Sequence, residues 1–169
     1  MSEVSEAIQA KCLAFGDRII KLNDYLLEQA SQKYDGGSKR YDVRKGKSAF
    51  SHQTSDLSQP SSFRHRTSRV PVHLQSVSNL CNQLLRAGTS IGANNAEACN
   101  AISKADFKSK SYIALKEARE SLYWIELLYR NKYIDDNQYR SIFNDCEELV
   151  KILVTRCKKI NEDLEKNTK

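Results

Sequence analysis

The chain has 169 residues, of which 40% are hydrophobic and 28% charged, and this length and composition are typical of a single globular domain rather than two. Its mean hydropathy is −0.62, and it has no apolar run long enough to cross a bilayer. An excess of basic over acidic residues gives a formal net charge of +6, which favours a polyanion as partner.

The first six residues include two acidic residues and no basic one, and they lead into an amphipathic pattern, so we expect no secretory signal. The five cysteines are an odd number without a Cys-x-x-Cys pair, which argues against a disulfide framework and for a reducing compartment. We therefore predict one cytoplasmic domain over residues 1–169 that does not contact a membrane.

The first predicted element is a helix over about residues 3–32. Apolar side chains recur there at alternating spacings of four and three, which is typical of one buried helical stripe. The stripe consists of Ile8, Cys12, Phe15, Ile19, Leu22 and Leu26.

Residues 33–71 differ in composition from the rest of the chain. They hold nine basic and three acidic residues, so the whole net charge lies in this segment and the remainder is balanced. They also hold both prolines, three of the six glycines and eight serines, with few aliphatic residues. Too little apolar surface is available to offset the entropy of ordering, so we predict a basic, flexible insertion.

Three more helices are predicted over about residues 72–165. Ser103 with Asp106, and Asp135 with Gln138, have the spacing of a capping box and predict where the last two helices begin. The apolar stripes are Val77, Leu80, Leu84, Gly88 and Ile91, then Leu115, Ala118, Leu122, Ile125 and Tyr129, then Tyr139, Ile142, Cys146, Leu149, Leu153, Cys157 and Ile160. The fold predicted is all-α: an antiparallel up-down four-helix bundle, with the basic disordered loop between helices 1 and 2.

The second predicted helix carries small residues four apart, namely Gly88, Gly92 and Ala96. Glycine inside a helix costs about 1 kcal/mol relative to alanine, and close approach of another helix would compensate for this cost. Polar side chains beside the strip are candidates for a buried structural network between the second and third helices. These are Arg86, Asn94, Glu97, Glu117 and Glu120.

Several stretches together resemble a bacterial family of four-helix bundles that includes the proteins encoded within 23S rRNA intervening sequences. They are QLLRAGTSIGAN at 83–94, EA at 97–98, SKADF at 103–107 and IALKEARESLYW at 113–124. The resemblance implies a small cytosolic bundle that assembles into a homopentamer. It also implies a distant relationship to the accessory variability determinant of diversity-generating retroelements, a basic pentamer that binds nucleic acid and a reverse transcriptase.

The chain departs from the family pattern in two respects. Members usually join the first two helices by a short turn, whereas here the 39 residues of the basic segment intervene. Ala87 and Asn95 stand where serine and an aliphatic residue are commoner. The first departure bears on how this end of the bundle packs.

The basic segment supplies the candidate nucleic-acid site. Its clustered cations suit the phosphates of RNA or DNA, and its aromatic side chains suit stacking on bases. The resemblance implies RNA rather than DNA. A solvated linker is the alternative for the same charge. The candidate phosphate-binding residues are Lys39, Arg40, Arg44, Lys45, Lys47, Arg64, Arg66 and Arg69.

Catalytic and metal chemistry find little support. The three histidines lack partners at zinc-site spacing, and Cys146 and Cys157 fall on an apolar stripe, where thiols act as packing groups. We therefore predict no catalytic residue, metal or cofactor. The function predicted is non-catalytic RNA binding by a homo-oligomer. The alternative is a scaffold for protein partners, such as an accessory protein of a reverse transcriptase.

Overall fold

A computed structural model describes residues 3–32 and 72–166. They form four helices: α1 (Glu3–Gln32), α2 (Val72–Cys99), α3 (Lys104–Arg130) and α4 (Asp136–Lys166). The predicted helices and their bounds are confirmed to within a residue or so. The predicted insertion 33–71 lies outside the described residues. None of the helices in the two described ranges combines the length and apolar composition that a membrane crossing requires.

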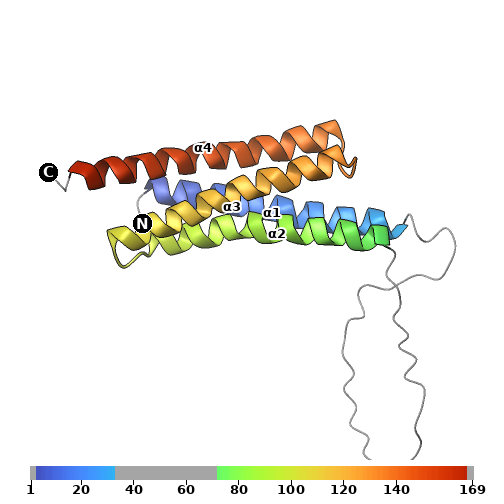
Figure 1. The fold of residues 1–169 in the computed structure, drawn as a ribbon, viewed down its shortest axis with the longest axis horizontal. Helices are drawn as coiled ribbons and strands as arrows, with labels where there is room; N and C mark the ends of the chain where they lie inside the picture. Colours follow the sequence, from blue (N-terminus) through green and yellow to red (C-terminus); the bar gives the residue numbers. More distant parts are fainter. Residues whose placement is uncertain (1–2, 33–71, 167–169) are drawn as a thin grey trace, which may run out of the picture.

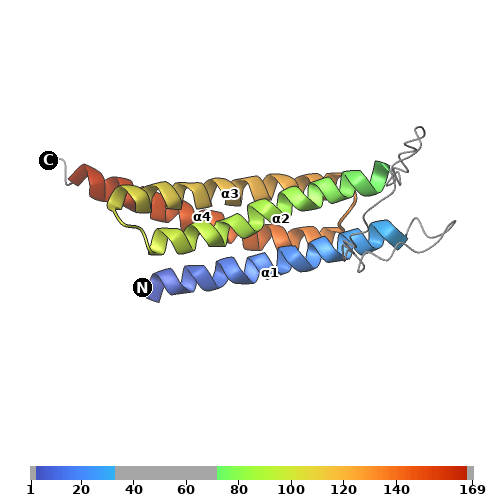
Figure 2. The ribbon, with the colours of Figure 1, turned by 90° about the horizontal axis from the view of Figure 1, so that it is seen from below.

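The helices lie side by side and alternate in direction (Figure 1, Figure 2). The backbone of α1 lies next to α2, that of α2 next to α3, that of α3 next to α4, and that of α4 next to α1, whereas the diagonal pairs of helices have no Cα atoms within 8 Å of each other. The predicted antiparallel four-helix bundle is therefore confirmed. The end of α1, the start of α2 and the turn between α3 and α4 meet at one end of the bundle, and the start of α1 and the end of α4 lie at the other.

The core forms where the predicted apolar stripes of the four helices meet. Each helix contributes fully buried side chains, and each such side chain stabilises the fold by about 1.5–3 kcal/mol relative to exposure. The largest of them include Phe15 and Ile19 of α1, Ile91 of α2, Ile125 and Leu128 of α3, and Leu149 and Leu153 of α4.

The glycines of α2 allow this helix to approach α1 closely. A Cβ added at Gly88 would lie 3.0 Å from Cγ1 of Ile19, and one added at Gly92 would lie 3.4 Å from Cβ of Cys12. A Cβ at Gly88 would require the Ile19 side chain to shift, so close packing compensates for the low helix propensity of glycine. The predicted contact strip of α2 is confirmed at both glycines.

The predicted caps are also present. The Ser103 hydroxyl oxygen accepts a hydrogen bond from the backbone N–H of Asp106 at 3.1 Å. At the start of α4, Asp135 Oδ1 accepts from the N–H of Gln138 at 2.8 Å, while Gln138 Oε1 accepts from the N–H of Asp135 at 3.0 Å. These bonds satisfy N–H groups that have no partner within the helix, and they define where α3 and α4 begin.

Candidate nucleic-acid interface

The end of the bundle at which α3 turns into α4 is where the basic segment joins the fold. The segment leaves α1 after Gln32 and enters α2 at Val72, and both residues lie at this end (Figure 1). The eight predicted phosphate-binding residues belong to this segment and lie outside the described residues. They are Lys39, Arg40, Arg44, Lys45, Lys47, Arg64, Arg66 and Arg69.

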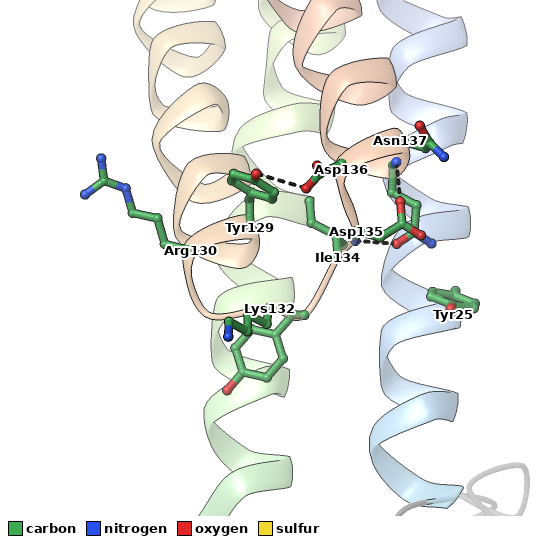
Figure 3. A pocket seen from close by; sticks show the side chains of 10 residues that line it. Tyr25, Tyr129, Arg130, Lys132, Ile134, Asp135, Asp136 and Asn137 are labelled. Carbon is green, nitrogen blue, oxygen red and sulfur yellow. Dashed lines mark hydrogen bonds between the residues drawn. The ribbon is translucent and has the colours of Figure 1, made fainter.

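An open cavity of about 940 Å³ lies at the same end, between α1 and the α3–α4 turn (Figure 3). Three tyrosines line it: Tyr25 from α1, Tyr129 from the last turn of α3, and Tyr133 from the loop that follows. Lys132 and Asp136 line it as well. Arg130 and Asp135 complete the charged lining, so the cavity combines aromatic rings with two cations and two carboxylates.

One of these tyrosines belongs to a rigid aromatic stack. The rings of Tyr129 and Tyr139 lie 4.2 Å apart at an interplanar angle of 14°. The Tyr129 hydroxyl donates to Asp136 Oδ1 at 3.0 Å, and the Tyr139 hydroxyl donates to Glu126 Oε2 at 2.6 Å. Both bonds favour the protonated phenol, so the pKa of Tyr129 is raised and that of Tyr139 is raised to about 12.

The carboxylate of Glu126, which accepts the hydrogen bond from Tyr139, is itself held in place. Glu126 Oε1 accepts a hydrogen bond from Arg130 Nε at 2.7 Å. The hydrogen bond from Tyr139, and then that from Arg130, lower the pKa of Glu126. Charge-assisted hydrogen bonds to Asp136 and Glu126 therefore limit the movement of the Tyr129 and Tyr139 rings.

Helix α3 ends in a backbone conformation that glycine normally provides. The N–H of Lys132 donates to the carbonyl of Tyr129 and the N–H of Tyr133 to that of Leu128, both at 2.9 Å, as in a Schellman motif. Lys132 has a φ of 59°, the only positive φ of a non-glycine residue in the described part of the chain. A lysine in this left-handed position is sterically unfavourable.

The predicted polar network of α2 and α3 is not a buried cluster. Its five residues are either exposed or half-buried. Glu97 forms an ion pair with Lys110 of α3, which does link the two helices. The exposed members are Arg86, Glu97 and Glu120, and the half-buried members are Asn94 and Glu117.

Two other members, Asn94 and Glu120, form hydrogen bonds within their own helices. Asn94 Nδ2 donates to the carbonyl of Ser90 in its own helix at 2.9 Å. Glu120 Oε1 accepts from Nε1 of Trp124 at 3.1 Å. The pKa of Glu117 is raised, first by burial and then by the charge of Glu120, while the charges of Lys116 and of Arg86 on α2 act to lower it. The predicted pairing of Arg86 with Glu117 therefore exists as an electrostatic interaction between α2 and α3, although it is not buried.

The buried polar residue of α2 is Asn95, which is 0% exposed. Its Nδ2 donates to Gln9 Oε1 of α1 at 2.5 Å, and its Oδ1 accepts from Arg156 Nη1 of α4 at 2.6 Å. The guanidinium carbon of Arg156 also lies 5.8 Å from the centre of the Phe107 ring of α3. Asn95 thus joins three helices, and together with Phe107 this cluster involves all four.

The cysteines are free thiols packed into the bundle. Burial raises the pKa of Cys12 and Cys81 to about 11 and that of Cys146 to about 12. Cys157 is also buried, and burial raises its pKa, while Cys99 is half-buried. No group of histidine, cysteine and acidic residues suited to a metal ion occurs within residues 3–32 and 72–166.

Comparison with known proteins places this bundle in a family. Residues 65–155 match the family model described as 23S rRNA-intervening sequence protein, which is more than half of the chain. The chain belongs to this family. No curated protein matches it.

A solved structure is similar to this chain across nearly its whole length. It is that of a protein of unknown function from the S23 ribosomal protein family of Bacteroides thetaiotaomicron. The two share 34% sequence identity, and the match covers 92% of this chain and 98% of the other, with a TM-score of 0.61. The resemblance identified from the sequence is therefore confirmed at the level of family and fold.

Proposed function

We propose that this intervening-sequence family protein is a non-catalytic, homo-oligomeric protein that binds RNA through its basic segment. The charge distribution carries the proposal. Residues 33–71 hold nine basic and three acidic residues, whereas the rest of the chain is balanced. A polyanion is therefore attracted mainly to the end of the bundle where this segment is attached.

Self-association is supported by apolar side chains that the single chain leaves uncovered. Leu13 is 60% exposed and Ile20 is 44% exposed, and a spacing of seven residues places them on the same face of α1. Burying such a face against other copies would remove it from water. Repetition of the basic segment in a ring of five would also add weak phosphate contacts through multivalency.

The chemistry of the thiols supports a binding role in the cytoplasm. Four of the five cysteines are buried, and all five are free, as is usual in a reducing compartment. Since burial raises the pKa of Cys146 to about 12, this thiol stays protonated near neutral pH and is a poor nucleophile.

The test measures how RNA affinity depends on salt. A variant with the eight candidate cations of residues 33–71 replaced by serine is compared with the wild type, using fluorescence anisotropy of a labelled single-stranded RNA. The plot of log affinity against log salt has a slope of about −0.7 per neutralised phosphate on a single strand. We expect the variant to bind more weakly and with a shallower slope.

The control replaces two exposed cations at the opposite end of the bundle, Lys158 and Lys159 of α4, by serine. This variant is expected to keep the wild-type slope. An equal slope for the wild type and the eight-cation variant would contradict the role of the segment. A wild type that binds no RNA at low salt would contradict the proposed function and favour a scaffold for protein partners.

A further inference from the structure

The cavity at the α3–α4 turn has the features of a small-molecule site. Its volume of about 940 Å³ lies within the range of about 300–1,000 Å³ common to ligand pockets. It lies at the end of the bundle where the basic segment begins and ends (Figure 1, Figure 3). A strand of RNA held by that segment would therefore pass close to it.

The aromatic side chains provide surfaces on which a flat ring can stack. Tyr129 lines the cavity, while the Tyr139 ring stacks on it. A nucleobase on the cavity side would extend that stack by one ring. Tyr25, which is 43% exposed, reaches the same space from α1. Because the Tyr129 hydroxyl is held by Asp136, this surface is ordered before any ligand arrives.

The two carboxylates of the cavity favour a base over a phosphate as the bound group. Asp135 and Asp136 line the cavity and use one carboxylate oxygen each, Asp135 for the N–H of Gln138 and Asp136 for the hydroxyl of Tyr129. The second oxygen of each has no hydrogen bond within the described part of the chain. Carboxylates repel phosphate but accept hydrogen bonds from the exocyclic amino group of a base.

The lysine at the edge of the cavity suits the phosphate attached to such a base. Lys132 is exposed and forms no ion pair with another described residue. It occupies a left-handed backbone position at which glycine would be sterically easier. An unfavourable conformation at the edge of a cavity is typical of residues kept for binding.

We infer that this cavity binds an unpaired nucleobase that carries an exocyclic amino group. Tyr129 and Tyr25 line different sides of the cavity (Figure 3), so one base stacks on each. The amino group of the base on Tyr129 donates to Asp136, and the adjoining phosphate contacts Lys132. This inference rests on the proposed RNA binding, and it adds recognition of bases to a charge-driven interaction with the backbone. Cytosine, adenine and guanine meet the requirement, and uracil does not.

The test compares three labelled single-stranded oligonucleotides of equal length: oligo(C), oligo(U) and an abasic strand. Affinities are measured by fluorescence anisotropy for the full chain and for Tyr25→Ala. Since stacking contributes about 1–3 kcal/mol per base, we expect Tyr25→Ala to weaken oligo(C) binding by about 5- to 100-fold. Binding of the abasic strand should not change.

Two further variants make the result specific. Tyr123→Ala removes an exposed tyrosine of α3 that does not line the cavity, and it should leave all three affinities unchanged. Asp136→Asn keeps an oxygen that accepts from Tyr129 but loses the carboxylate, so the preference for oligo(C) over oligo(U) should shrink. Circular dichroism of each variant verifies that the bundle is intact.

The outcomes separate base recognition in the cavity from RNA binding by the protein as a whole. Equal wild-type affinity for oligo(C) and the abasic strand would overturn base recognition and leave backbone binding intact. Equal affinity for oligo(C) and oligo(U) would overturn the role of the carboxylates and with it the selectivity inferred. Equal losses in Tyr25→Ala and Tyr123→Ala would overturn the cavity as the site. A wild type that binds no strand would overturn both the inference and the proposed function.

Discussion

Lys132 occupies a position where its removal should make the protein more stable. Its φ of 59° places the Cβ near the following carbonyl oxygen, which costs an L-residue about 1–2 kcal/mol. Glycine has no Cβ and adopts this conformation freely. The Lys132→Gly variant therefore keeps the hydrogen bonds that end α3 and loses the steric cost.

The expected gain is reduced by the unfolded chain, which glycine makes more flexible by about 0.4–1 kcal/mol. The net stabilisation is therefore about 0.5–1 kcal/mol, or about 1–4 °C in Tm for a domain of this size. Urea denaturation followed by circular dichroism measures it, with the protein concentration held fixed because self-association also contributes to stability.

Lys132→Ala is the matched control. Alanine removes the same charge but keeps a Cβ in the left-handed conformation, so its stability should stay close to that of the wild type. If Lys132→Gly were less stable than the wild type, or if glycine and alanine gave the same stability, the lysine would not be under strain. In that case the argument that it is kept for binding would fail.

Three further predictions concern the bundle itself and are checked by urea denaturation. Gly88→Ala should destabilise the protein by about 1–3 kcal/mol, because the added Cβ would lie 3.0 Å from a side-chain carbon of α1. Gly16→Ala is the control: its Cβ would meet no atom within 4 Å, so it should stabilise by about 0.5–1 kcal/mol. Equal effects of the two substitutions would refute close packing at Gly88. Asn95→Leu should destabilise by about 1–3 kcal/mol, since it leaves a guanidinium and an amide without their partner, and an unchanged midpoint would mean that this network does not stabilise the fold. The raised pKa of Glu117 means that the folded protein disfavours the charged carboxylate and loses stability as pH rises above 4.5. Glu117→Gln should therefore stabilise the protein by up to about 0.5 kcal/mol at pH 7 and have no effect at about pH 3, where the carboxyl is protonated in both the folded and the unfolded state. A gain that persists in acid would contradict this cause.

The helices could be predicted because local patterns determine them. The apolar spacings in residues 3–32 and the Asp135–Gln138 capping box depend on residues a few positions apart, so the sequence alone carries them. The contact of Gly88 and Gly92 with another helix followed from residue size, although the identity of that helix as α1 depends on the packing of the whole bundle.

The buried polar side chain of α2 is Asn95 and not its predicted neighbour Asn94. Asn95 follows Ile91 by four residues and so continues the apolar stripe of α2, a signal in the sequence that the prediction did not use. Its partners, Gln9 and Arg156, are far away in sequence. No short-range pattern indicates such a contact.

The tyrosine cavity could not be predicted for a similar reason. Tyr25 and Tyr129 come from different helices, and the long intervening sequence gives no sign that they line one space. Lys132 carried no signal either, because the usual indicators of a left-handed helix end are glycine and asparagine.

Native mass spectrometry of protein purified at low salt shows whether several copies of this chain together hold RNA. We expect a particle of several chains, near five times the 19.3 kDa of one chain, that carries RNA and releases it after a high-salt wash. A particle with the mass of one chain and no nucleic acid would contradict the proposed function.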